Sequence, residues 1–304
     1  MAGAELRVIT GPTAAGKSAL ALALAERHGA AIVSADSRQI YRGFDVGTAK
    51  PGEAERALAP HYGIDVIEPT ERYSAARWAD DAERWIAAAR ASGREPVIVG
   101  GTGFYLRALF APLFAEPALD PERRHALERA LAPLATGELR RWCERLDPAR
   151  AALGRTQLLR AIEVALLTGR RLSDLHAQPT RAPRFRARYL VVDPGAHLAG
   201  RIERRVDEML ASGWLDEVRS LVKRVPGDAP AWNAAGYAVV RELVEGAIAL
   251  PAARERVVIE TRQYAKRQRT WMRHQLDAAR VTRLDPGDPD AMEKAERWWN
   301  GATG

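Results

Sequence analysis

An eight-residue glycine-rich segment near the N-terminus has the residue types that bind phosphate. It reads Gly11-Pro12-Thr13-Ala14-Ala15-Gly16-Lys17-Ser18 and fits the pattern G-x-x-x-x-G-K-[ST]. Glycines let backbone N–H groups turn toward an oxyanion, the lysine can pair with phosphate oxygens, and the serine hydroxyl can coordinate Mg²⁺. An apolar stretch precedes the segment and strong helix formers follow it. The segment therefore predicts a phosphorylated ligand, and many nucleotide-binding proteins, ATP-binding ones included, share the motif.

Two further polar positions follow apolar stretches that we predict as strands. Asp36 comes after 31–34, and Gly100-Gly101-Thr102-Gly103 comes after 96–99. Because ligands on parallel sheets bind at the carboxyl ends of the strands, we expect these positions to lie near the glycine-rich segment. Asp36 can be a helix cap, a ligand of Mg²⁺ or of a hydroxyl, or a general base. The glycines allow a ligand to approach the backbone closely, although a plain tight turn has the same pattern.

A basic stripe occurs in the C-terminal part of the chain. Arg262, Lys266, Arg269 and Arg273 are spaced four, three and four residues apart, so they share one face of a predicted helix. Acidic residues are few near this face, and we interpret it as a surface for a phosphate backbone. A solvated helix face is the alternative. An earlier cluster, Arg201, Arg204 and Arg205, can clamp a diphosphate or form ion pairs within its own helix.

Composition limits the class of protein. The 304 residues include 46 Lys and Arg against 39 Asp and Glu, a net charge of +7, which makes an anionic partner such as nucleic acid plausible. Cys143 is the single cysteine, which excludes an intramolecular disulfide and a zinc site built from cysteines. The sequence shows no leader and no long apolar run, so we expect a cytoplasmic protein that does not contact membranes.

Apolar stretches alternate with helical ones, which predicts an α/β fold: a parallel sheet core carrying the phosphate-binding loop, with helices on both faces. Residues 119–181 have almost no strand signal, and we predict a small inserted helical domain there. The core then consists of 1–118 and 182–304, the second part being mostly helical and containing the basic helix.

These segments together resemble the tRNA dimethylallyltransferase family, also called isopentenyl-tRNA transferases. The resemblance runs from residue 6 to about 275, and its block 34–51 is far more specific than the phosphate-binding loop. The matching segments, in family order, are 11–18, 34–43, 45–51, 100–105, 159–164 and 265–273.

The resemblance implies a fold and a reaction. The fold is a phosphate-binding core with an inserted helical domain that closes over tRNA. The reaction transfers a dimethylallyl group from dimethylallyl diphosphate to N6 of the adenine just 3′ of the anticodon. Segment 11–18 would hold the diphosphate, with Mg²⁺ on Ser18. Asp36 would accept the N6 proton, Thr102 would lie near the adenine, and the implied catalytic residues are Asp36, Thr102, Lys17 and Arg205.

The resemblance also implies contacts with the tRNA anticodon stem-loop. They fall on Asp36, Ser37, Arg38, Gln39, Thr102, Arg124, Thr156, Gln157, Leu158, Leu159, Arg160, Lys266, Arg267, Gln268, Arg269, Thr270, Trp271, Met272 and Arg273. At two places the sequence departs from the family pattern, so the residue roles known for the family transfer less directly there. Thr156-Gln157 stands where the family usually has Gln-Arg, and Ala234-Ala235-Gly236-Tyr237 stands where it usually has an Ile-Gly-Tyr element.

Two alternative functions use the same residues. A small-molecule or nucleoside kinase would bind ATP in the loop and use Asp36 to activate a substrate hydroxyl. A non-catalytic RNA-binding NTPase would need neither Asp36 nor Thr102 for chemistry. The basic helix and the insertion favour the transferase, which we expect to act as a monomer.

Overall fold

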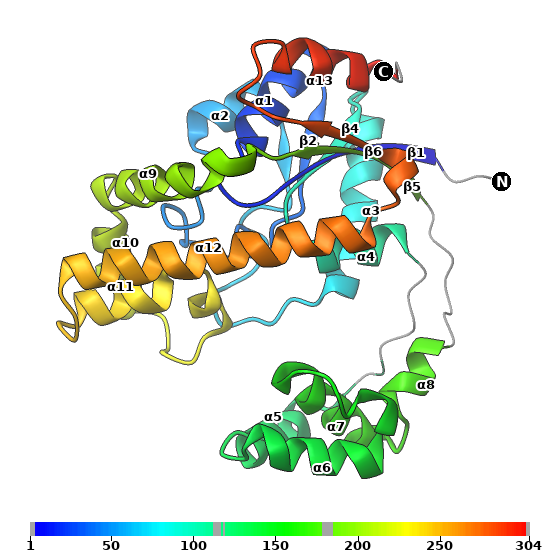
Figure 1. The fold of residues 1–304 in the computed structure, drawn as a ribbon, viewed down its shortest axis with the longest axis vertical. Helices are drawn as coiled ribbons and strands as arrows, with labels where there is room; N and C mark the ends of the chain where they lie inside the picture. The colour runs from blue at the N-terminus through cyan, green and yellow to red at the C-terminus, as the bar shows by residue number, and fades with distance from the viewer. Residues whose placement is uncertain (1–3, 112–116, 118, 178–184, 302–304) are drawn as a thin grey trace. The chain divides into compact units, whose positions relative to one another are not determined.

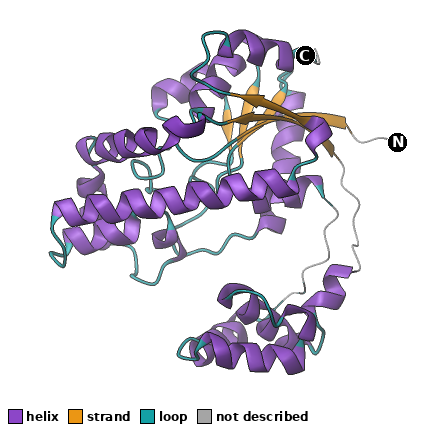
Figure 2. Cartoon of the chain, viewed as in Figure 1, coloured by secondary structure: helices purple, strands orange, loops and turns teal. Residues whose placement is uncertain are grey.

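Six strands form one parallel sheet at the centre of the structure. The computed structural model describes residues 4–111, 117, 119–177 and 185–301. Within these residues the strand order is β3-β2-β4-β1-β5-β6, and every pairing is parallel. The strands are β1 (Ala4–Thr10), β2 (Ala31–Ser34), β3 (His61–Tyr62), β4 (Pro96–Val99), β5 (Phe185–Val192) and β6 (Val281–Leu284). Helices lie on both sides of the sheet (Figures 1 and 2), so the predicted α/β fold is confirmed.

The two faces of the sheet are covered by different helices. On one face, α1 (Lys17–His28) and α13 (Ala291–Trp299) bury an apolar layer with alternate residues of the strands, such as Ile9 and Val97. On the other face lie α3 (Ala75–Ala91) and α4 (Gly103–Phe110). This alternation follows from the two-residue period of side chains along a strand. The parallel pairing places the ends of β1, β2 and β4 side by side, since Val99 lies opposite both Ile9 and Ser34.

A second apolar core joins the C-terminal helices to the loop after β2. Trp214 and Tyr237 are almost fully buried there, and the Tyr237 ring packs against both Trp214 and Phe44. The helices around this core are α9 (Leu198–Ala211), α10 (Trp214–Val222), α11 (Tyr237–Val244) and α12 (Leu250–Gln275). Helix α12 packs along α9 and α11 (Figure 1). The shorter helices of this unit are α2 (Glu53–Leu58), η2 (Gly195–His197), η3 (Pro230–Asn233) and η4 (Ala278–Arg280).

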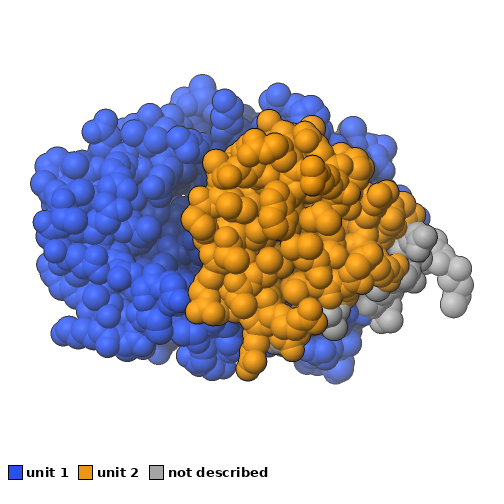
Figure 3. Space-filling model, turned by 90° about the horizontal axis from the view of Figure 1, so that it is seen from below, with its two compact units in different colours: residues 1–110, 184–304 blue, residues 111–183 orange. Residues whose placement is uncertain are grey.

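The chain divides into two compact units, coloured separately in Figure 3: residues 1–110 with 184–304, and residues 111–183. The second unit contains α5 (Pro121–Leu131), α6 (Thr136–Leu146), η1 (Pro148–Arg150), α7 (Arg155–Thr168) and α8 (Leu172–Ala177). Its helices bury their own core, which includes Cys143. The division falls at 110/111 and 183/184 rather than at the expected 118/119 and 181/182; residues 118, 181 and 182 lie outside the described residues. Among the described helices, none is both long and apolar enough to cross a membrane.

The sequence analysis does not predict two of the strands. β3 has only two residues, and β6 lies in the region predicted to be mostly helical. Both are short strands at the edges of the sheet. Their local sequence carries little strand signal, and pairing with a neighbouring strand decides their conformation.

Candidate active site

The glycine-rich segment forms a loop between β1 and α1. Gly16 and Ala14 both have positive φ angles, 96° and 61°, a conformation that costs a non-glycine residue about 1–3 kcal/mol. Helix α1 begins at Lys17. The first N–H groups of a helix have no partner inside the helix, so they form a site for an anion together with those of the loop.

Lys17 and Arg205 supply positive charge beside this loop. The Nζ of Lys17 donates a hydrogen bond to the carbonyl of Pro12 at 2.7 Å. Burial and the nearby guanidinium of Arg205 lower the pKa of Lys17 to about 8, although Asp36 opposes this shift. Burial also lowers the pKa of Arg205. Two enclosed cations that destabilise each other would be stabilised by an anionic ligand between them.

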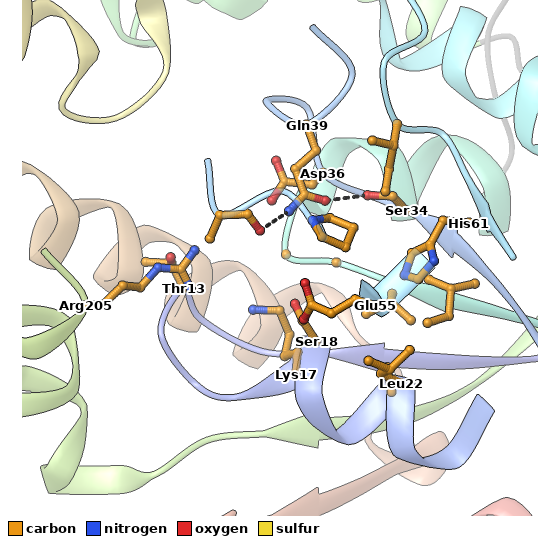
Figure 4. A pocket seen from close by; sticks show the side chains of 18 of the residues that line it. Thr13, Lys17, Ser18, Leu22, Ser34, Asp36, Gln39, Glu55, His61 and Arg205 are labelled. Carbon is orange, nitrogen blue, oxygen red and sulfur yellow. Dashed lines mark hydrogen bonds between the residues drawn. The ribbon is translucent and has the colours of Figure 1, made fainter. Parts of the chain in front are cut away.

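Asp36 faces the same cavity as these two cations. Lys17, Asp36 and Arg205 line it together with Tyr264 and Gln268. Figure 4 shows the charged ends of Lys17, Asp36 and Arg205 pointing into one space from α1, from the loop after β2 and from α9. The structure thus brings together a phosphate-binding loop, two cations and one carboxylate.

Thr102 lies next to Asp36 through its contacts with Ser37. The Thr102 Oγ1 accepts the Ser37 N–H at 3.0 Å and donates to the Ser37 Oγ at 3.3 Å. The Oδ1 of Asp36 accepts the N–H of Arg38 at 2.8 Å, which leaves its other oxygen without a hydrogen-bond partner in the described structure. Asp36 is therefore oriented by the backbone and keeps one carboxylate oxygen for a proton.

Gln39 holds a neighbouring loop in place. Its Oε1 accepts a hydrogen bond from Ser34 at 3.1 Å, and its Nε2 donates to the carbonyls of Thr48 and Ala49 at 3.3 and 3.0 Å. Gln39 also lines the cavity. We had expected a tRNA contact at Gln39, and the structure shows that both ends of its amide are already engaged within the protein.

The glycines after β4 are needed for packing inside the protein. A Cβ on Gly100 would lie 2.2 Å from the carbonyl oxygen of Ala35. A Cβ on Gly101 would lie 2.3 Å from the Nε2 of Gln268, and one on Gly103 would lie 2.3 Å from the ring of Trp271. The sequence suggested that these glycines let a ligand approach. The close neighbours are instead the end of β2 and helix α12.

One face of α12 fastens this helix to the end of the sheet. Gln268 is buried; its Oε1 accepts the Thr13 N–H at 2.8 Å and its Nε2 donates to the Gly101 carbonyl at 3.0 Å. Met272 is buried against Thr10, whose hydroxyl donates to its sulfur at 3.7 Å. These side chains, predicted as tRNA contacts, instead join α12 to the phosphate-binding loop and to the end of β1, because the 3.6-residue period turns them inward.

The basic stripe of α12 is partly paired, contrary to the prediction. Arg269 binds both carboxylate oxygens of Asp193 and the carbonyl of Gly195, and Arg262 pairs with Glu203. The acidic partners come from other elements, 76 and 59 residues away, so spacing along α12 could not show them. Within the described residues, three exposed cations of this segment have no ion pair: Lys266, Arg267 and Arg273. Thr270 is exposed as well.

Two of the predicted tRNA contacts in the second unit, Arg124 and Arg160, pair with a buried carboxylate. Glu163 is 5% exposed and pairs with both Arg124 and Arg160 at 3.2 Å. Leu158 is fully buried in the core of this unit, so its side chain cannot reach RNA and the expectation for it is corrected. Thr156 and Gln157 are exposed, and Leu159 packs at the edge of that core.

Tyr264 is a cavity residue that the sequence analysis did not single out. It lines the cavity beside Asp36, and burial raises its pKa to about 12. It belongs to the inward stripe of α12, which a period of three and four residues could have revealed. That stripe consists of Val257, Thr261, Tyr264, Gln268 and Met272.

The donor set of the cavity fits Mg²⁺ bound together with a diphosphate. No group of three or more His, Cys, Asp or Glu side chains in the described part of the chain could hold a metal. Mg²⁺ needs few protein ligands when substrate phosphates and water complete its octahedron. The Ser18 hydroxyl lines the cavity beside the phosphate-binding loop and meets that need.

Comparison with known proteins gives consistent matches. The family model described as IPP transferase matches residues 39–275, and that described as isopentenyl transferase matches residues 4–59. The chain is 44% identical to a tRNA dimethylallyltransferase of Anaeromyxobacter sp. (strain K), over 95% of this chain and 96% of that protein. It is 45% identical to a protein of the same name from Halorhodospira halophila, over 93% and 94%.

Solved structures match over nearly the whole chain. The tRNA isopentenylpyrophosphate transferase of Bacillus halodurans has a TM-score of 0.69 at 32% identity, covering 98% of this chain and 96% of that one. A eukaryotic dimethylallyltransferase acting on tRNA has a TM-score of 0.80 at 24% identity, covering 99% and 80%. At that identity the second match supports the fold alone.

Proposed function

The chain belongs to the IPP transferase family, and from this premise we propose that it is a tRNA dimethylallyltransferase. It would transfer a dimethylallyl group from dimethylallyl diphosphate to N6 of the adenine just 3′ of the anticodon. One observation carries this proposal: Asp36 lines the same cavity as Lys17, Arg205 and the phosphate-binding loop. A base therefore lies beside a site for a diphosphate leaving group.

The reaction breaks one C–O bond and forms one C–N bond. N6 attacks C1 of the prenyl group, the bond from C1 to the diphosphate oxygen breaks, and diphosphate leaves with the electron pair. Lys17, Arg205 and the N–H groups at the start of α1 stabilise the charge that grows on the leaving oxygens. The N–H of Thr13 is not among these donors, because it already binds Gln268.

Asp36 accepts the proton that N6 loses. An exocyclic adenine nitrogen is a weak nucleophile, so proton removal accompanies C–N bond formation. The Arg38 N–H fixes one oxygen of Asp36, and the other oxygen stays available for this proton. Thr102, oriented by Ser37, would contact the adenine edge.

Mg²⁺ is part of the proposal. Ser18 would hold it beside the diphosphate, and when bound it neutralises charge on the leaving group. Asp36 stays free to accept the proton.

The tRNA would bind through exposed side chains of α12 and of the second unit. Lys266 and Arg273 carry charge without ion pairs in the described structure, which suits contacts to phosphate. An adenine in a single-stranded loop can leave its stack at a cost of a few kcal/mol. We further propose that the protein acts as a cytoplasmic monomer.

A transfer assay tests the proposed function. The protein is incubated with Mg²⁺, labelled dimethylallyl diphosphate and an anticodon stem-loop carrying adenine 3′ of the anticodon. We expect label in the RNA and release of diphosphate, and no label when guanine replaces that adenine. Absence of label together with turnover of ATP would refute the transferase and favour the kinase.

A further inference from the structure

A second cavity, with an apolar part in its lining, opens from the same group of charged residues. Thr13, Asp36, Arg205 and Tyr264 line both cavities. The rest of the second cavity is lined mainly by residues of α9, α10 and α12. Its apolar lining consists of Ile202, Val206, Met209, Trp214, Ala234, Ala235 and Val257.

We propose that the apolar part of this cavity holds the prenyl chain of the donor and that Trp214, at its wall, limits the chain to five carbons. The inference rests on the proposed function and adds a determinant of donor length to it. Trp214 is therefore assigned as a specificity-determining residue, with no part in bond making or breaking.

The position of the charged groups directs the chain into this cavity. A diphosphate held between Lys17 and Arg205 places the first carbon of the donor near Asp36, at the junction of the two cavities. The first cavity is lined by the polar side chains of Gln39, Glu55 and His61 as well as by apolar ones such as Leu22, Ile32 and Ile64. The polar groups would lose water against a hydrocarbon chain. The second cavity exposes less polar surface than the first, so a hydrocarbon chain costs less desolvation there.

The indole of Trp214 is wedged between two glycines. A Cβ on Gly47 would lie 2.2 Å from its Nε1, and a Cβ on Gly236 would lie 2.6 Å from its ring. Gly236 also has a φ of +83°, which glycine adopts without strain. The ring is 1% exposed and packs edge-on against Tyr237 at 5.4 Å. The wall is therefore rigid and does not yield to a longer chain.

The size of the cavity agrees with a short chain. Its volume is about 60 Å³, which suits a short chain such as the five carbons of a dimethylallyl group better than a long one. A geranyl group has ten carbons and would have to displace Trp214.

The departure from the family pattern at 234 and 235 bears on the same cavity. Ala234 and Ala235 line it, where the sequence departs from the Ile-Gly-Tyr pattern that the family usually has. Ala235 is partly exposed, so a larger side chain there fills the cavity without overpacking the core. Substitutions can therefore enlarge the cavity at Trp214 or Met209 and fill it at Ala235.

The experiment compares two donors on the full-length protein. Values of kcat/KM are measured with dimethylallyl and geranyl diphosphate and the adenine stem-loop, for wild type, Trp214→Leu and Met209→Ala. Both variants open the cavity, Met209 being only half-buried. We expect the ratio for geranyl over dimethylallyl to rise at least about tenfold, since a few methylene groups in an apolar site are worth that much. Trp232→Leu is the matched control, because Trp232 lies in the same core and outside the cavity lining.

The filling variant Ala235→Leu keeps the inference testable if Trp214→Leu does not fold. We expect it to raise KM for dimethylallyl diphosphate about tenfold or more while KM for the RNA stays the same. An unchanged donor ratio in Met209→Ala together with an unchanged donor KM in Ala235→Leu would overturn the inference. So would an equal rise of the ratio in Trp232→Leu. Failure of wild type to transfer dimethylallyl refutes the proposed function instead.

Discussion

Replacing Gln268 by Met separates a structural role from RNA binding on one helix. The Gln268 amide joins two loops, through a 2.8 Å hydrogen bond from the Thr13 N–H and a 3.0 Å hydrogen bond to the Gly101 carbonyl. The side chain is 7% exposed. Methionine is similarly long and unbranched but can replace neither bond. Gln268→Met therefore leaves one donor and one acceptor without partners at the edge of the cavity.

The expected loss of stability follows from those two groups. A buried polar group left unpaired costs about 1–3 kcal/mol. Two of them give about 2–6 kcal/mol, and because water can reach the partly exposed Thr13 we expect the lower half, about 2–4 kcal/mol. The phosphate-binding loop also loses its anchor on α12. Each 1.4 kcal/mol lost from donor binding raises its dissociation constant about tenfold, so KM for dimethylallyl diphosphate should rise by about that factor or more.

Lys266→Met is the matched control, two residues earlier on the same helix. Lys266 is exposed and has no ion pair in the described structure, so its loss should change the free energy of unfolding by no more than about 0.5 kcal/mol. It should lower the slope of log affinity for RNA against log salt by about 0.7–0.9, the loss of one phosphate contact. Gln268→Met should leave that slope unchanged.

Three measurements test these expectations. Urea denaturation gives the free energy of unfolding, steady-state kinetics give KM for the donor, and RNA binding at several salt concentrations gives the salt slope. The reasoning is refuted if Gln268→Met is as stable as wild type and binds the donor equally well. It is also refuted if Gln268→Met lowers the salt slope as Lys266→Met does, since Gln268 would then be the RNA contact that the sequence suggested.

Three further predictions concern the charged groups. Asp36→Asn keeps the bond to the Arg38 N–H and should lower kcat about 10²–10⁴-fold with RNA binding retained; wild-type turnover would exclude Asp36 as the base. Since the pKa of Lys17 is lowered to about 8, the ammonium loses its proton as pH rises through 8. Donor kcat/KM should then fall above that pH, and the activity that remains in Lys17→Arg should show no such fall. Arg273→Ala should lower the salt slope of RNA binding by about 0.7–0.9. Arg269→Ala should leave the slope unchanged because Asp193 and Gly195 already hold that guanidinium, and equal slopes in both variants would contradict this assignment.

Local sequence was sufficient for the elements that carry short-range patterns. The glycine-rich segment, its flanking strand and helix, and the apolar stretch before Asp36 depend on neighbours along the chain. The parallel sheet followed from the alternation of strands and helices. The strand β6 did not follow, because its four residues have a weak pattern and pair with β5 only in the folded protein.

Sequence alone determined that a phosphate-binding loop, a carboxylate and a threonine follow three strands, because each motif is contiguous. Only the tertiary structure decided which side chains meet. Arg205 joins Lys17 from a helix almost 190 residues later, Gln268 turns inward to hold the loop, and Arg269 is bound by Asp193. The physical reason is that burial and ion pairing depend on neighbours in space, and residues on one helix only one position apart can face the core and the solvent.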